Sequence, residues 1–245
     1  MRFAALILLA GCATRVEPAP RAAGEARRAL DALRACRSLR TRFESTIAPA
    51  RGDALTIRGE TVSLAGGVAF VRYRSSGGDV KRIVRVGSRA WVYHAVAEEW
   101  VAAEELGMSG AGRGVQSLDG VIAVLLRHAD TAVRAEKDVL SIPFAGADLE
   151  VVTREHASPG AFVWAGCSAE ARLHLDAAGA IRRVRVGADF LSADRTSLRY
   201  ESEVHIESAD ADWSLKFDVP LAPHVREAVV GAPGVPAEVA RAIGE

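Results

Sequence analysis

Alternation between apolar and polar residues is the main pattern of this chain from residue 39 onward. Short runs rich in Val, Thr, Tyr and Trp recur, and each ends at Gly or at polar residues, which is typical of β-strands in an antiparallel sheet. The spacing around Gly87 and Ser88 indicates a two-residue hairpin turn. The pattern predicts strands at 39–48, 55–64, 68–75, 80–86, 89–95, 98–102, 138–143, 147–154, 169–176 and 180–187.

The strongest alternation covers residues 196–219. One set of positions is mostly apolar and the other is mostly charged, with a break around 209–211. Such a segment fits a pair of strands with one buried and one solvated face. We therefore expect a long hairpin over 196–219.

Two segments carry apolar residues at helical spacing. Residues 25–37 place Leu30 and its neighbours on one stripe, and residues 117–128 do the same around Leu125. Each helix should cover part of a sheet with its apolar stripe. The expected fold is therefore mainly β (α+β), with covering helices.

The folded part reads as one domain over residues 25–219, since no repeat and no clear boundary interrupts it. Beyond residue 219 the chain is rich in Pro, which predicts a C-terminal tail at 220–245 made of loop and a short helix at 236–243.

The first residues resemble an export signal. Arg2 precedes a short apolar run, and Leu9-Ala10-Gly11-Cys12 follows it directly. This quartet is similar to the lipobox of bacterial lipoproteins. The resemblance implies a signal peptide at 1–11, cleavage between Gly11 and Cys12, and fatty acyl groups such as palmitate on Cys12. The alternative is an ordinary secretory peptide with an incidental cysteine.

A lipidated Cys12 would hold the protein on a membrane, because two or more acyl chains give stable attachment. Residues 12–24 contain two prolines and few large apolar residues, so we expect a tether there. Ala13, rather than Asp, follows the cysteine, and by resemblance to a bacterial sorting rule this favours the outer membrane, facing the periplasm.

The net charge and the spacing of reactive side chains argue against several classes of function. Lys and Arg together number 31, and Asp and Glu together also number 31, so the formal net charge is zero. A nucleic-acid-binding domain would normally carry a net positive charge. The six His residues are spread singly, and the Gly-rich segment 107–114 lacks the Lys-Ser/Thr of a phosphate-binding loop. We expect neither a metal site nor a cofactor, and no enzyme class is supported.

Two further cysteines, Cys36 and Cys167, stand in the folded part. In an exported protein two cysteines commonly form a disulfide bond. The sequence is compatible with either a disulfide bond between them or two buried thiols.

An N-terminal helix is followed by strands that carry the sequence pattern Gly87, Trp91, Tyr93 and Trp100. This arrangement resembles the LolA/LolB-like lipoprotein-carrier superfamily. The resemblance implies a curved antiparallel sheet that forms an incomplete barrel, a half-barrel covered by two or three helices. It also implies a protein that binds acyl chains of lipids or lipoproteins on the concave face. A monomer is expected.

An apolar concave face could instead be a filled core, and the protein would then be a structural or protein-interaction lipoprotein without cargo. If cargo binds, the resemblance implies that it contacts Leu55, Ile57, Trp91, Tyr93, Leu198, Tyr200, Val204, Trp213, Leu215 and Phe217.

Overall fold

The computed structural model describes residues 20–64, 67–78, 80–106, 118–145, 148, 162–192, 194–209 and 219–244. The helices are α1 (Pro20–Arg34), α3 (Leu118–His128), the short 3-10 helix η1 (Ala129–Thr131), α5 (Pro223–Val230) and α6 (Ala237–Gly244). The strands are β1 (Ser38–Pro49), β2 (Leu55–Leu64), β3 (Val68–Ser75), β4 (Val80–Val86), β5 (Arg89–His94), β6 (Glu99–Ala102), β7 (Val133–Glu136), β8 (Val139–Ala145), β9 (Phe162–Leu175), β10 (Ile181–Ser192) and β11 (Ser197–Ala209).

All these strands form one antiparallel sheet in the order β6-β5-β4-β3-β2-β1-β11-β10-β9-β8-β7. The first half of the chain builds the sheet outward from β1 to β6, and the second half returns from β7 inward to β11. The two halves meet where β1 pairs with β11, from Leu39 opposite Ala209 to Pro49 opposite Leu198. The expected mainly β fold with covering helices is confirmed.

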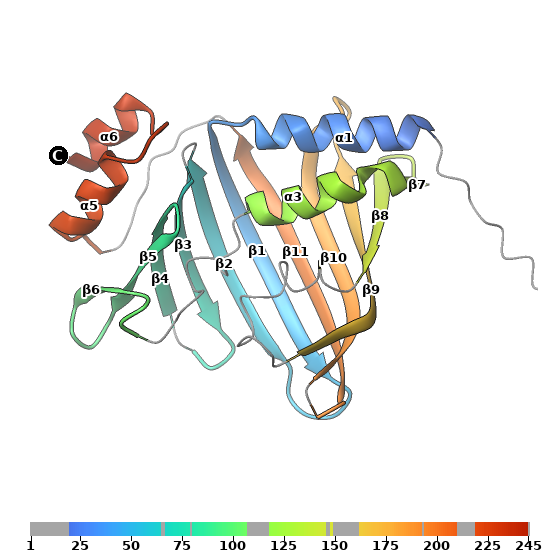
Figure 1. The fold of residues 1–245 in the computed structure, drawn as a ribbon, viewed down its shortest axis with the longest axis horizontal. Helices are drawn as coiled ribbons and strands as arrows, with labels where there is room; N and C mark the ends of the chain where they lie inside the picture. The colour runs from blue at the N-terminus through green and yellow to red at the C-terminus, as the bar shows by residue number, and fades with distance from the viewer. Residues whose placement is uncertain are drawn as a thin grey trace, which may run out of the picture.

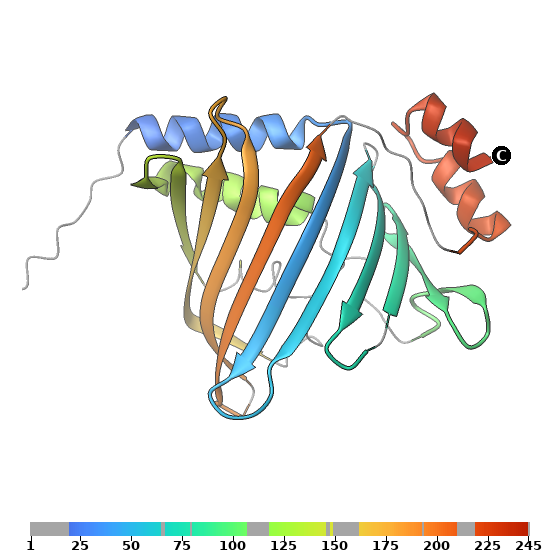
Figure 2. The ribbon, with the colours of Figure 1, turned by 180° about the vertical axis from the view of Figure 1, so that it is seen from behind.

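The sheet is curved but open (Figures 1 and 2), so β6 and β7 remain as its edges. Both edge strands span only four residues. A short edge strand offers few unpaired backbone groups to another chain, which protects an open sheet from edge-to-edge association. Helices α1 and α3 lie together on the side around which the sheet curls (Figures 1 and 2).

Strand positions in the first half agree closely with the alternation pattern. The strands predicted at 55–64, 68–75 and 80–86 have these bounds in the structure. The two-residue turn is also present: Val86 pairs with Arg89, and Gly87 has a φ of 60°. A positive φ at this position suits glycine, because the absence of a Cβ removes the steric cost.

The hairpin predicted over 196–219 is wrong. Strand β11 has β1 on one side and β10 on the other, with both ladders present from Leu198 to His205. Over these residues neither edge of β11 is left for a following strand, and residues 210–218 lie outside the described part of the chain. Alternation identifies which side chains share a face, but it does not identify the neighbouring strand.

Other differences concern helix bounds and missed elements. Helix α1 is displaced from the predicted 25–37 toward the N-terminus, and the short helix predicted at 236–243 is α6. Strand β7 and helix α5 were not predicted. The Gly-rich segment 107–114 and, apart from Asp148, the strand predicted at 147–154 lie outside the described residues.

Candidate functional site

The candidate site is the inner face of the sheet, defined here as the face toward α1 and α3. Every strand of the sheet's centre contributes alternate side chains to it, because successive residues of a strand point to opposite faces. These side chains belong to one continuous buried cluster that crosses the sheet from β5 to β8. Its strand members include Phe43, Val71, Ile83, Val92, Leu140, Ile142, Ala171, Leu173, Val184, Val186 and Val204.

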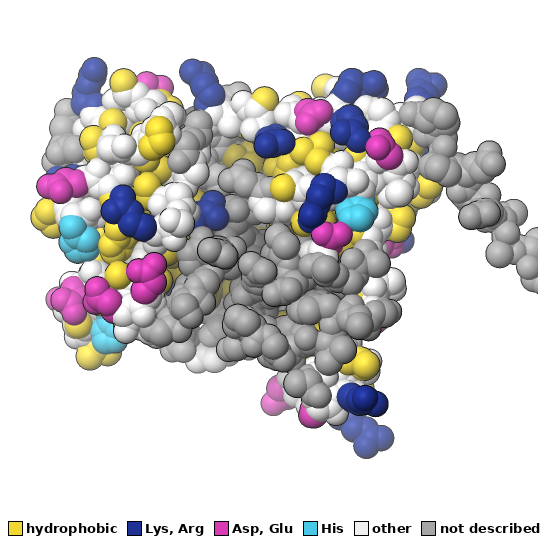
Figure 3. Space-filling view, viewed as in Figure 1, with side chains coloured by type: hydrophobic (Ala, Val, Ile, Leu, Met, Phe, Trp, Pro, Cys, Tyr) yellow, Lys and Arg dark blue, Asp and Glu magenta, His cyan; other side chains and the backbone are white. Residues whose placement is uncertain are grey.

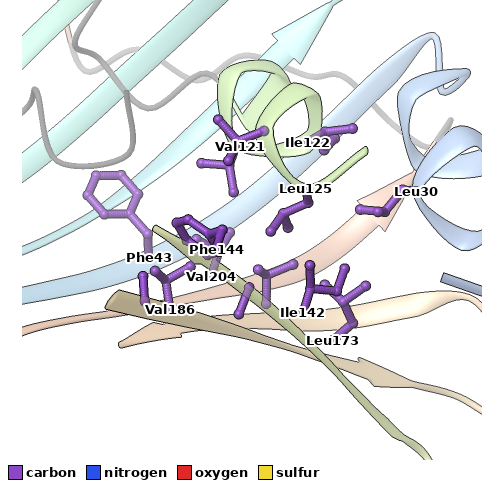
Figure 4. Close-up of a cluster of buried hydrophobic side chains, with 14 of the residues drawn as sticks. Leu30, Phe43, Val121, Ile122, Leu125, Ile142, Phe144, Leu173, Val186 and Val204 are labelled. Atoms are coloured by element: carbon purple, nitrogen blue, oxygen red, sulfur yellow. The ribbon is translucent and has the colours of Figure 1, made fainter. Parts of the chain in front are cut away.

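Helices α1 and α3 place apolar side chains directly on this face (Figure 4). Leu30 of α1 and Leu125 of α3 are fully buried, and Ile122 is nearly so. Each such side chain contributes roughly 1.5–3 kcal/mol of burial free energy. Helix α1 contacts β7 and β10, and α3 contacts β8, so both helices pack mainly on the β7–β10 half of the sheet.

The inner face differs in chemistry between its two halves. Strands β8–β10 contribute almost only apolar side chains, whereas β1 and β2 also contribute buried polar ones. Ser45 Oγ lies 2.9 Å from Ser202 Oγ across the β1–β11 pair. Thr61 Oγ1 is buried and makes no hydrogen bond within the described residues. The β1–β2 half of the inner face therefore contains a buried polar group without a hydrogen bond, whereas the half beneath the helices is almost entirely apolar.

Gly59 marks a tight point of the inner face. It stands between Phe43 and Tyr73 in register. A Cβ built at this position would lie 2.4 Å from the Arg72 carbonyl oxygen and 2.8 Å from Phe43 Cζ. Glycine is required here by the close approach of its neighbours rather than by a turn.

Of the expected cargo residues, Leu198, Tyr200 and Val204 are buried in the cluster of the inner face. Ile57 is partly buried and packs against the same cluster. Leu55, at the start of β2, is 39% exposed and belongs to neither buried cluster. Trp213, Leu215 and Phe217 lie outside the described residues.

Trp91 and Tyr93 lie on the outer face, which corrects their expected place. Their neighbour Val92 belongs to the inner cluster, while Trp91 and Tyr93 belong to a second cluster with α5 and α6. The indole nitrogen of Trp100 donates a hydrogen bond to the Pro220 carbonyl at 2.9 Å, which ties β6 to the chain before α5. An apolar residue in a strand that is covered on both sides gives no sign of which side it faces.

Helix α5 makes this second cluster possible and was missed by sequence reasoning. Val225 and Val229 are fully buried in it. The available signal was Pro223, which takes the first helical position. Proline is favoured there because its missing N–H would have no helical partner, so a proline-rich tail does not exclude a helix.

In the structure Cys36 and Cys167 are not bonded to each other, and the disulfide between them stays a prediction. Cys36 Sγ lies 3.4 Å from the Ala32 carbonyl oxygen of α1. Cys167 is buried in the inner cluster. Gly11 and Cys12 lie outside the described residues, so cleavage and lipidation stay predictions.

The outer face away from α5 and α6 is polar. Arg58 pairs with Glu44 at 2.9 Å across β2 and β1, and Arg42 pairs with Glu207 at 2.7 Å across β1 and β11. Cross-strand pairs of opposite charge favour this register and keep the face solvated. The charged half of the alternation is thereby explained without a catalytic role.

Among the histidines that the structure describes, His174 on β9 is the one whose pKa clearly departs from the ordinary value. Burial lowers the pKa of His174, and the nearby Arg183 guanidinium, which donates to Nδ1 at 3.1 Å, lowers it further. Asp138 and Glu203 oppose this shift, but the net direction is downward. The imidazole is therefore harder to protonate than an ordinary histidine side chain.

Among the residues that the structure describes, no three or more His, Cys, Asp or Glu side chains are grouped so that they could hold a metal ion. No described helix is long and apolar enough to cross a membrane.

No family model matches the sequence, and no curated protein matches it. Several solved structures are similar. The lipoprotein LppX of Mycobacterium tuberculosis is 13% identical, with a TM-score of 0.47 over 80% of this chain and 99% of that one. LprF from Mycobacterium bovis is 10% identical, with a TM-score of 0.44 over 82% and 99%. A LolA superfamily protein from Nitrosomonas europaea is 9% identical, with a TM-score of 0.33 over 76% and 94%. These scores are low, and the fold of this chain is established by its own strand order.

Proposed function

We propose that this chain is a lipid-anchored protein of the bacterial cell envelope that binds acyl chains on the inner face of its open sheet. One observation carries the proposal: the apolar inner face is continuous from β5 to β8, yet its β7–β10 half is covered by two helices rather than by closure of the barrel. Helices can move away from a sheet without breaking its strand ladders. The same face can therefore be offered to a ligand.

Displacement of the helices by cargo is energetically reasonable. Opening the site would expose Leu30, Ile122 and Leu125 of the two helices. An acyl chain that takes their place gains about 0.8 kcal/mol for each methylene that it buries. A chain of ordinary length thus regains on the order of 10 kcal/mol, which can offset the loss of several buried side chains.

The anchor is the second part of the proposal. Lipidation of Cys12 would keep the domain at the membrane, with the outer membrane as the proposed location. Replacement of Cys12 by Ala tests this part. We expect the variant to incorporate no labelled palmitate, whereas wild type does; equal labelling of the two proteins would contradict the assignment.

Cargo binding is tested on the full chain extracted from its membrane. We expect organic extraction and mass spectrometry to find acyl lipids that co-purify with it. Hydrogen exchange with and without added oleate gives the mechanism: amides of α1 and α3 should lose protection when oleate binds, while those of β9 and β10 keep it. Absence of both co-purifying lipid and an exchange change would refute the cargo proposal.

The alternative is an envelope interaction protein with a filled core. It is favoured by the close packing beneath the helices, where Leu125 and Ile142 are fully buried among other apolar side chains (Figure 4). This alternative predicts that oleate leaves the exchange of α1 and α3 unchanged.

A further inference from the structure

A groove of about 630 Å³ runs between α1 and α3, on the side of the helices that faces away from the sheet. Its apolar lining, the floor of the groove, comes from α3, where Ala123 is exposed, Leu126 is half-buried and Val124 is buried beneath them. Figure 3 shows hydrophobic side chains between the two helices, with Lys and Arg side chains next to them. The volume lies within the range that is usual for small-molecule sites.

Three arginines form the rim of this groove: Arg27 and Arg34 from α1, and Arg127 from α3. An apolar floor with a basic rim is complementary to an amphiphile with an anionic head. A lipid of this kind places its acyl chain on the floor and its phosphate between the guanidinium groups, which bind phosphate oxygens with short, charge-assisted hydrogen bonds.

The carboxylates near the rim leave room for such a head group. Arg27 pairs with Asp130 at 2.9 Å and Arg127 pairs with Asp148 at 2.5 Å. Both arginine side chains are about half exposed or more, at 48% and 60%. The Arg27–Asp130 pair is exposed on both sides, and exposed ion pairs contribute little, so Arg27 can exchange its carboxylate for a phosphate at small cost. Asp148 is only 21% exposed, but it keeps its contact with His128 Nε2 at 2.7 Å when Arg127 turns to a phosphate. Arg34 has no ion pair with any other described residue.

The sequence also places this groove near the proposed anchor. Helix α1 begins at Pro20, eight residues after Cys12. Eight residues span at most roughly 29 Å when fully extended. A lipid on Cys12 would therefore keep the start of α1, and with it the basic helix face, within reach of the bilayer surface.

We infer that the α1–α3 groove binds an anionic phospholipid of the membrane to which the chain is anchored. This inference rests on the proposed anchor, but not on displacement of the helices, because the groove exists while α1 and α3 remain on the sheet. The head group is specified by Arg27, Arg34 and Arg127, and the acyl chain by the apolar floor.

The test is native mass spectrometry of the full chain in detergent, titrated with dioleoyl phosphatidylglycerol or dioleoyl phosphatidylcholine. The two probes share their acyl chains and differ in head-group charge. We expect wild type to prefer phosphatidylglycerol. The triple variant Arg27→Gln, Arg34→Gln, Arg127→Gln should lower the affinity for phosphatidylglycerol by at least roughly tenfold, since one basic side chain near an anionic lipid surface accounts for about fivefold.

A matched triple variant controls for the loss of charge elsewhere. Arg58→Gln, Arg72→Gln, Arg74→Gln removes three arginines from the opposite side of the sheet and should bind phosphatidylglycerol like wild type. Equal affinity of wild type for both lipids, or an equal loss in both triple variants, would overturn the inference.

A steric variant separates groove binding from diffuse attraction. Ala123 is exposed on the groove floor, so Ala123→Trp should fill the groove and weaken phosphatidylglycerol binding with all three arginines intact; unchanged binding would overturn the inference. Hydrogen exchange distinguishes the two proposals, because phosphatidylglycerol in the groove leaves α1 and α3 protected. Groove-dependent binding, with neither co-purifying interior lipid nor an exchange change on addition of oleate, would refute only the cargo proposal.

Discussion

Replacement of Leu125 by Ala tests whether α3 is a removable part of the inner core. Leu125 is fully buried, with 0% of its surface exposed to solvent, and its side chain points from α3 toward the sheet (Figure 4). Leucine-to-alanine changes at such sites lower the free energy of unfolding by 2–5 kcal/mol, with the value set by the cavity that remains. We expect about 3 kcal/mol here, because the site is surrounded by other buried residues.

The same loss should favour cargo if α3 leaves the sheet when cargo binds. A closed state weakened by about 3 kcal/mol raises the fraction of open protein, and therefore the apparent affinity, by up to roughly a hundredfold. Oleate binding to the full chain, followed by native mass spectrometry, measures this change. Guanidinium unfolding of the same samples measures stability.

Leu64→Ala is the matched control, since Leu64 is 5% exposed and lies in the second cluster with α5 and α6. It should destabilise the protein similarly but leave oleate affinity unchanged. If Leu125→Ala loses stability and its oleate affinity stays within about threefold of wild type, α3 does not leave the sheet and the displacement mechanism is refuted.

Three further results are expected. Gly59→Ala should lower the free energy of unfolding by about 1–3 kcal/mol through overpacking, whereas Gly187→Ala, whose Cβ would meet nothing within 4 Å, should not; guanidinium unfolding compares them. Trp100→Phe removes the hydrogen bond to Pro220 and should cost about 1 kcal/mol, seen as faster amide exchange in α5. Because the pKa of His174 is lower in the folded than in the unfolded protein, its contribution to stability is present above about pH 6.5 and is lost as the pH falls below it. His174→Gln should therefore lose less stability than wild type between pH 7.5 and 5.5, and equal losses would contradict the shift.

The sequence was most informative where one face of a strand is buried and the other is charged. In β11, the alternation of Leu198, Tyr200 and Val204 with charged neighbours correctly indicated which side chains are buried. In β5 the same reasoning failed, because Trp91 and Val92 are both buried, on opposite faces. The candidate site could therefore be predicted only on strands that have a solvated side.

Long-range pairing was beyond the reach of local patterns. One partner of β11 is β1, about 150 or more positions earlier in the chain, and the Ser45–Ser202 contact joins residues 157 positions apart. A hairpin is the natural expectation for two adjacent alternating segments, but it assumes that neighbours in sequence are neighbours in the sheet. Here the return of the second half of the chain to β1 fills the place that the hairpin would have used.

The sequence by itself determined that this protein is mainly β, where most strands lie, and that two amphipathic helices must cover something. These properties depend on the spacing of apolar residues, which is a local quantity. Only the tertiary structure decided the strand order, the outer placement of Trp91, the docking of α5, and the basic groove between α1 and α3. Each of these depends on which surfaces meet, and that is set by packing between segments far apart in the chain.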